Sequence, residues 1–266
     1  WVGPHLVYSA LFGGGDIFRE RATTQMSLGL TPGSAPWARR IDAATDLRLA
    51  IAEARGSGAT NLKLYGDVAP ALAGPVLAEA TRQGMLTTAH ATVFPARPSD
   101  LVEAGVGSLA HAPYLVWEAV DEVPADYRKR TEGPWASVPP DHPRLIALYR
   151  RMAERGTTLD ATLYVYQAMK NYSPEVRADW SDAAFRWGAQ ATRLARQHGV
   201  GLGARRHEDG SIHQRQDTEP FGSKERRPAR IGEEFDDGNF LKEQDGFLQK
   251  DSNNAQGGEN RDGGKQ

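Results

Sequence analysis

Three short apolar runs within residues 61–113 constrain the fold of this 266-residue chain more than any other feature. Near its end, each run carries one polar residue that is able to bind a metal ion: Lys63, His90 and His111. Helix-compatible sequence separates the runs, so strands and helices alternate. This alternation predicts a parallel sheet, in which side chains at the carboxyl ends of neighbouring strands converge on one edge.

The same alternation extends beyond this segment. Apolar residues recur at spacings of three and four from Ala44 to Ala54, and Pro70 and Gly84 mark the start and the end of another helix. The fold class is therefore α/β. We expect helices over about residues 42–54, 70–83, 99–104, 143–154 and 181–198, and further strands over 3–9, 157–163 and from 200 onward.

Two connections are expected to remain irregular. Glycines at 13–15 open a polar stretch that reaches about Arg40. A glycine-rich loop binds phosphate only when a helix begins directly after it, so an ordinary loop is the favoured interpretation here. Residues 120–142 are rich in proline and charge, and we expect them to form an insertion over the mouth of the sheet.

The composition excludes several classes of function. A net charge of -2 gives no electrostatic support for nucleic-acid binding, and the absence of cysteine removes disulfides and thiolate metal sites. No window approaches the ~18 apolar residues of a membrane span. We expect a small-molecule substrate, no membrane partner and a cytoplasmic location. Because the chain starts at Trp1 without Met, its natural N-terminus is expected to be missing.

Residues 205–266 differ in character from the rest. About two in five of them are charged, and Gly, Gln and Asn accumulate, a composition typical of disorder. Two interpretations stay open: a flexible tail, or an out-of-frame translation, which the interrupted strand after residue 200 favours. We predict an ordered domain over residues 1–204 and a disordered tail over residues 205–266.

The two histidines are most informative as a pair. A lone histidine near a strand end is more often a hydrogen-bonded core residue than a metal ligand, and that alternative stays open. His90 and His111, however, each end an apolar run, and one helix separates them, as in a single βα unit. Their imidazoles are expected to lie on adjacent strands, where they are able to share a metal ion.

Lys63 lies between Leu62 and Leu64 in what the pattern predicts to be a buried strand. Desolvation makes an isolated ammonium costly and lowers the pKa of a lysine. A neutral amine takes up carbon dioxide as a carbamate, which is an anionic oxygen ligand for metal ions. The alternative, favoured by spacing alone, is that Lys63 extends its ammonium into solvent at the mouth of the sheet.

Three motifs in this order resemble the amidohydrolase superfamily, in particular imidazolonepropionase-like enzymes and Xaa-Pro dipeptidases. The resemblance covers about residues 3–203 and implies a (β/α)8 TIM barrel with zinc or a similar divalent metal, as one or two ions. It implies that a carboxylated Lys63 is the bridging ligand on strand 4, and that His90 and His111 are the ligands on strands 5 and 6. The motifs are Gly-Ala-Thr-Asn-Leu-Lys-Leu at 58–64, Glu-Ala at 79–80 and Gly84 leading to Ala-His-Ala at 89–91, and Ala-Gly-Val-Gly-Ser-Leu-Ala-His-Ala at 104–112.

The chain also departs from the family pattern. The His-x-His pair of the first strand and the Gly-Thr-Asp of the eighth are absent, Asp209 comes too late to replace that aspartate, and Ala110 stands where the family has Glu. We therefore expect a partial barrel, containing strands 3 to 8 with the last one broken. We accordingly expect weak metal binding and little turnover. We also expect another chain to complete the barrel, as in a homo-oligomer.

The resemblance implies a metal-dependent hydrolase, in which metal-activated water attacks a C–N bond in an amide, a lactam or a dipeptide. Tyr65, Tyr114 and Tyr164 lie just beyond strand ends and are candidates for lining the substrate pocket, with plain packing as the alternative. The alternative function is a non-catalytic barrel fragment whose disordered tail binds a partner. The glycines in residues 199–203 are similar to a dinucleotide-binding loop. Such a loop follows a strand and opens a helix, whereas here a helix precedes the glycines and a sequence of disordered composition follows, so this function is not favoured.

Overall fold

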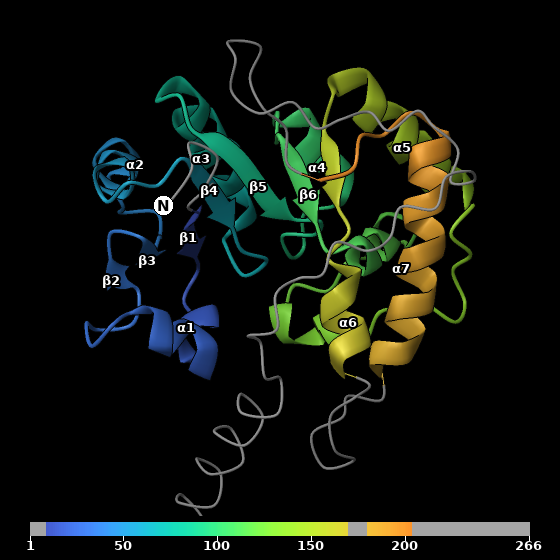
Figure 1. Cartoon of the computed structure of the whole chain (residues 1–266), viewed down its shortest axis with the longest axis horizontal. Helices are drawn as coiled ribbons and strands as arrows, with labels where there is room; N and C mark the ends of the chain where they lie inside the picture. Colours follow the sequence, from blue (N-terminus) through green and yellow to red (C-terminus); the bar gives the residue numbers. More distant parts are fainter. Residues whose placement is uncertain (1–8, 170–179, 204–266) are drawn as a thin grey trace, which may run out of the picture. The chain divides into compact units, whose positions relative to one another are not determined.

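The computed structural model describes residues 9–169 and 180–203 of the chain (Figure 1). A seven-stranded sheet organises this part, with the strand order β2-β3-β1-β4-β5-β6-β7. All neighbouring strands are parallel except β2 and β3. The strands are β1 (Ser9–Gly13), β2 (Ser34–Ala35), β3 (Ala38–Arg40), β4 (Asn61–Leu64), β5 (Leu86–His90), β6 (Ser108–Ala110) and β7 (Thr158–Asp160).

Helices connect the parallel strands, as the alternation of the sequence predicts. Pro70 starts α3 and Pro98 starts α4, since proline is suited to the first turn of a helix. The α-helices are α1 (Arg21–Met26), α2 (Leu47–Gly56), α3 (Pro70–Arg82), α4 (Pro98–Glu103), α5 (Pro143–Arg155), α6 (Leu163–Met169) and α7 (Trp180–Gln197). The 3-10 helices are η1 (Ile17–Arg19), η2 (Ala112–Glu118) and η3 (Tyr127–Thr131). None of the helices in the described part is long and apolar enough to cross a membrane.

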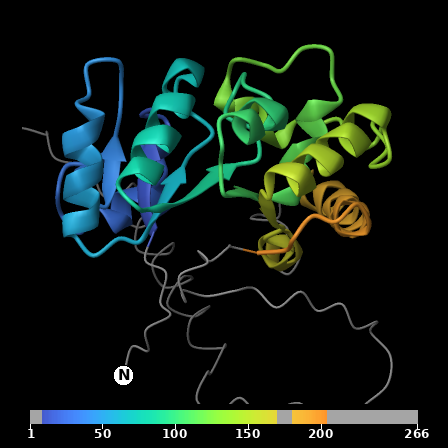
Figure 2. The same cartoon turned by 90° about the horizontal axis from the view of Figure 1, so that it is seen from above.

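One face of the sheet is apolar. Side chains alternate between the two faces along each strand, and the register aligns fully buried apolar residues from neighbouring strands on this face. They are Ala10, Phe12, Leu62, Leu64, Ala89, Leu109 and Leu159. In Figure 2 the helices α2 and α3 lie along the same side of the strands. Their buried residues belong to the same hydrophobic core as these strand residues, so this face fixes the strand register.

The opposite face of the sheet is polar and carries the candidate site. One row across the strands runs Leu11, Lys63, Thr88, Ser108 and Thr158. Below this row, Asn61 accepts a hydrogen bond from the hydroxyl of Thr88 at 3.2 Å and donates one to Ser9 at 2.8 Å. Hydrogen bonding therefore compensates for the burial of Asn61 and Thr88, whereas the buried hydroxyl of Ser108 in the same face has no hydrogen-bond partner among the described residues.

Several boundaries differ from those predicted. The first described strand is Ser9–Gly13, and the strand predicted over residues 3–9 lies outside the described part except for Ser9. The stretch up to Arg40 is not irregular, because β3 pairs with β1. Strands of two or three residues are too short for a side-chain alternation to be visible in the sequence. The helix predicted over residues 42–54 starts later, at Leu47, because the side chain of Asp46 caps it by accepting a hydrogen bond from the amide of Leu49.

The C-terminal elements also differ. The strand predicted over residues 157–163 ends at Asp160, and α6 begins at Leu163. Of the strand predicted from residue 200, the described residues up to 203 show a single bridge between Leu202 and Leu159, beyond β7. The tail predicted over residues 205–266 lies outside the described residues, and closure of the sheet into a barrel stays a prediction.

Candidate functional site

Lys63, His90 and Tyr65 lie on the polar face near the carboxyl ends of adjacent strands. Lys63 is opposite Thr88, and His90 follows two residues later on the same face of β5. Tyr65 directly follows β4, and the centroid of its ring is 4.5 Å from that of His90. The regular register of β4 and β5 is sufficient to bring these three side chains together.

His111 reaches the same place by a different route. It follows Ala110, which is paired with His90, so in a continued strand its side chain would face the apolar side. Instead its backbone adopts the left-handed region with φ 70°, and its ring centroid lies 4.6 Å from that of His90, at an interplanar angle of 85°. A left-handed conformation is uncommon for a residue other than glycine and is often associated with functional sites.

Two hydrogen bonds hold His111 in this conformation. Its backbone N–H donates to the carbonyl of Asp160 at 2.9 Å, and its Nδ1 lies 2.7 Å from Oγ1 of Thr162. Thr162 also has a positive φ, of 46°. Two strained residues from segments 51 positions apart therefore stabilise each other at the edge of the sheet.

The two imidazoles are held in the neutral form. Burial is the largest cause that lowers the pKa of His90 well below its ordinary value, and the positive charges of neighbouring groups add to it. Burial and the charge of Lys63 do the same for His111. His90 is 5% exposed, and its Nδ1 has no hydrogen-bond partner. Neutral imidazoles with an available lone pair are the form of histidine that binds metals.

Lys63 shares this environment. Desolvation lowers the pKa of its amine from 10.5 to about 7, although the nearby carboxylate of Asp160 acts in the opposite direction. A substantial fraction of the amine is therefore neutral near pH 7. Asp160, at the end of β7, has no counterpart among the predicted site residues.

The types of donor atom offered by His90, His111 and Lys63 suit a divalent metal ion. Among residues 9–169 and 180–203, no three His, Asp or Glu side chains are grouped closely enough to hold an ion. Two neutral imidazoles with an orphaned buried nitrogen are suitable zinc ligands, and His111 has the outer hydrogen-bond partner that orients a ligand. A third donor from this cluster requires Lys63 to carry a carbamate.

Only two of the three predicted tyrosines join this cluster. The ring centroid of Tyr114 lies 6.0 Å from that of His90 and 5.7 Å from that of His111, and Tyr65 contacts His90 as described above. Tyr164 does not join it, because the chain turns into α6 at Leu163 and leaves the Tyr164 side chain 82% exposed.

Two further tyrosines were not predicted. Tyr127 lies in the insertion over residues 120–142, with its ring centroid 6.3 Å from that of His90. Tyr166 packs against Tyr114, with a centroid distance of 6.4 Å. Their position in loops and in a short helix gives no periodic signal in the sequence.

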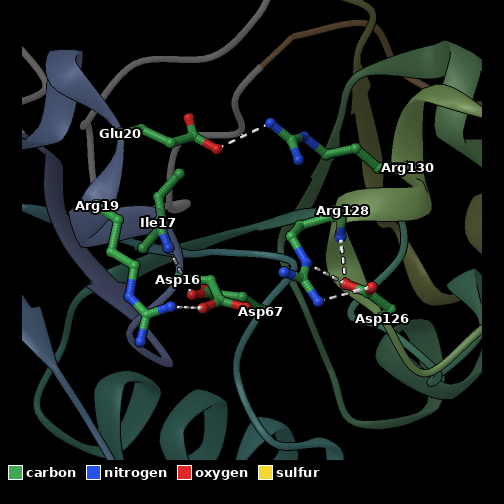
Figure 3. A network of polar contacts seen from close by, with 8 residues as sticks. All are labelled: Asp16, Ile17, Arg19, Glu20, Asp67, Asp126, Arg128 and Arg130. Carbon is green, nitrogen blue, oxygen red and sulfur yellow. Dashed lines mark hydrogen bonds and ion pairs between the residues drawn. The ribbon is translucent and has the colours of Figure 1, made fainter.

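The glycine-rich loop has an internal partner for its amides. Oδ2 of Asp67 accepts a hydrogen bond from the backbone N–H of Gly15 at 3.0 Å. It accepts another from the backbone N–H of Ile17 at 2.9 Å (Figure 3). Gly14 packs tightly here, since a Cβ on it would lie 2.0 Å from the carbonyl oxygen of Asp67. The loop therefore joins the end of β1 to the end of β4, and nothing in it favours the phosphate-binding alternative.

Comparisons with known proteins give distant similarities of fold. No protein-family description and no curated protein matches the chain. Among solved structures, it is similar to A. niger ochratoxinase at 20% identity and a TM-score of 0.48, covering 74% of this chain and 44% of that one. It is also similar to an uncharacterised protein at 20% identity and a TM-score of 0.43, covering 63% and 39%. The chain spans less than half of either structure, and neither likeness identifies a family.

Proposed function

We propose that this chain carries the centre of a metal-dependent hydrolase at the carboxyl edge of its parallel sheet. Lys63, His90 and His111 are the proposed ligands, with zinc as the preferred ion. The observation that supports this most directly is the pair of neutral imidazoles with ring centroids 4.6 Å apart, beside an amine whose pKa is lowered to about 7. His90 is buried and Lys63 and His111 are half-buried, and three basic groups so close together favour the neutral forms that bind a metal ion, although the carboxylate of Asp160 is also nearby.

The histidines supply lone pairs from fixed positions. The contact between Nδ1 of His111 and Oγ1 of Thr162 occupies that nitrogen, so Nε2 is the nitrogen proposed to bind the ion. In His90 the buried Nδ1 without a partner is the corresponding donor. Because both rings stay neutral at physiological pH, neither has to lose a proton before the ion binds.

Lys63 supplies the third ligand after modification. Its neutral amine attacks carbon dioxide, forms an N–C bond and loses one proton, which gives a carbamate anion. The negative charge then compensates the bound cation, whereas an unmodified ammonium would repel it. Desolvation is the largest influence on Lys63, and it favours the neutral amine that this reaction needs.

The proposed reaction is hydrolysis of a C–N bond, in an amide, a lactam or a dipeptide. A bound divalent ion supplies a water of lowered pKa and polarises a carbonyl group. Tyr65 and Tyr114 keep their phenolic protons, because burial raises the pKa of both. They are placed beside His90, where their hydroxyl groups are able to donate hydrogen bonds to a bound substrate.

Metal content is the direct test. The parent chain, expressed with zinc and dialysed, is compared with the triple variant Lys63→Ala, His90→Ala, His111→Ala. His142→Asn is the matched control, because it removes an imidazole from the start of α5 while keeping a side chain that caps the helix. We expect the parent and the control to retain zinc and the triple variant to retain none.

Two outcomes would contradict the proposal. Zinc retained by the triple variant would place the ion elsewhere, and a metal-free parent would leave the cluster without the proposed role. If the parent binds zinc, hydrolysis of dipeptides, lactams and N-acyl amino acids, with and without a chelator, tests the reaction. Binding without hydrolysis on this panel favours the alternative, a chain that uses the fold without catalysis.

A further inference from the structure

Arg130, in the insertion over residues 120–142, extends toward the segment that follows β1. Its Nη2 lies 2.8 Å from Oε1 of Glu20, and Figure 3 shows the two side chains pointing toward each other from opposite sides. The two residues are 110 positions apart in the sequence. The side chain of Arg130 is 22% exposed and that of Glu20 is 41% exposed.

The guanidinium of Arg130 is fixed in orientation by aromatic groups of the site. Its Cζ lies 4.2 Å from the centroid of the Tyr127 ring, and it is also within hydrogen-bonding contact of the Tyr114 side chain. Both rings approach His90. The positive charge of Arg130 is close enough to contribute to the lowered pKa of His90. Arg130 therefore belongs to the surroundings of the proposed metal centre.

A stacked, oriented guanidinium is well suited to a carboxylate. Its planar fork of N–H donors matches the two oxygens of that group, and stacking on an aromatic ring fixes the plane of the fork. Glu20 presents a carboxylate of the protein itself, and it is the more exposed member of the pair. An ion pair of this exposure contributes little stability, so a ligand carboxylate exchanges with Glu20 at small cost.

We propose that Arg130 is a specificity-determining residue that binds a carboxylate of the substrate, and that Glu20 occupies Arg130 when no substrate is bound. The inference rests on the proposed hydrolase function and names its substrate class: compounds that carry a carboxylate near the C–N bond to be broken. Tyr127 and Tyr114 orient the guanidinium, while Lys63, His90 and His111 remain the proposed metal ligands.

Binding of a carboxylate and its neutral amide distinguishes this role from a structural one. Calorimetry on the full chain, freed of metal with a chelator, compares hippurate with hippuramide. We expect the parent to prefer hippurate, and Arg130→Gln to weaken hippurate binding by about 10- to 100-fold without changing hippuramide binding. Glu20→Gln is expected to strengthen hippurate binding several-fold, since it removes the competing carboxylate. Arg55→Gln, an exposed arginine at the end of α2, is the matched control.

The opposite signs of the two variants make the test decisive. If the pair only ties two segments together, Arg130→Gln and Glu20→Gln will both weaken binding, and will affect hippurate and hippuramide equally. That result, or a parent that binds both compounds equally, overturns the proposal. Arg130→Lys keeps the charge and loses the planar fork, so its affinity for hippurate is expected to lie between those of the parent and Arg130→Gln. If Arg130→Gln does not fold, the affinity of Arg130→Lys tests the proposal in its place. Because the ion is absent, failure of this test is separate from failure to bind zinc.

Discussion

Replacing Lys63 with methionine should change how the stability of the protein depends on pH. Desolvation lowers the pKa of Lys63 to about 7 in the folded chain, against an ordinary value of 10.5 when it is unfolded. Between these values the unfolded chain binds more protons than the folded one, so the free energy of unfolding rises with pH. Lys63→Met has a side chain of similar length without the amine, and it lacks this contribution.

The magnitude follows from the two pKa values. With pKa values of about 7 in the folded chain and 10.5 in the unfolded chain, the free energy of unfolding of the parent rises by about 2 kcal/mol more than that of the variant between pH 7 and pH 9. The gain is smaller below pH 7, because the amine is then largely protonated in both the folded and the unfolded chain. Other titrating groups are common to both proteins and cancel in the difference.

Urea denaturation at pH 7 and pH 9, with chelator and in buffers free of carbon dioxide, measures this difference. The exposed Lys129→Met is the matched control for the loss of one lysine. If the parent and Lys63→Met keep the same difference in unfolding free energy at both pH values, the Lys63 amine is hydrated and charged in the folded chain. The carbamate proposal would then lose its chemical basis.

Two further predictions concern the site and the scaffold. Thr162→Val removes the hydroxyl that contacts Nδ1 of His111 and should lower zinc affinity by about 10- to 100-fold in a competition titration; an unchanged affinity would show that His111 needs no orienting partner. Gly14→Ala should destabilise the fold, because its Cβ would lie 2.0 Å from the Asp67 carbonyl oxygen. Gly74→Ala in α3 meets nothing within 4 Å and should raise the free energy of unfolding by about 0.5–1 kcal/mol in thermal unfolding. Equal effects of the two substitutions would contradict the packing described for Gly14.

The sequence identified the strands that carry the proposed site. β4, β5 and β6 lie where short apolar runs between helical segments predicted them, and α3 and α5 start at the expected prolines. This information is local, because alternation within a strand and spacing along a helix depend only on neighbouring residues. Placing Lys63 and His90 on one face of adjacent strands follows directly from that local pattern.

The sequence was less informative wherever short segments pair or loops pack. β2 and β3 have too few residues to show a period; β3 pairs in parallel with β1, and β2 pairs antiparallel with β3. Tyr164 was expected at the pocket, but its place depends on where β7 ends and α6 begins. Nothing in the residues after β7 marks that boundary, since the turn at Thr162 relies on its contact with His111.

The sequence alone thus determined the alternation of strands and helices and the identity of three basic residues at strand ends. Only the tertiary structure decided that His111 turns back toward His90 through a left-handed backbone, and that Arg130 meets Glu20 across 110 positions. The physical reason is that the succession of strands and helices and the alternation of side chains along a strand depend on neighbours along the chain. The direction of a residue beyond a strand end is set instead by hydrogen bonds and charges from segments far away in the sequence.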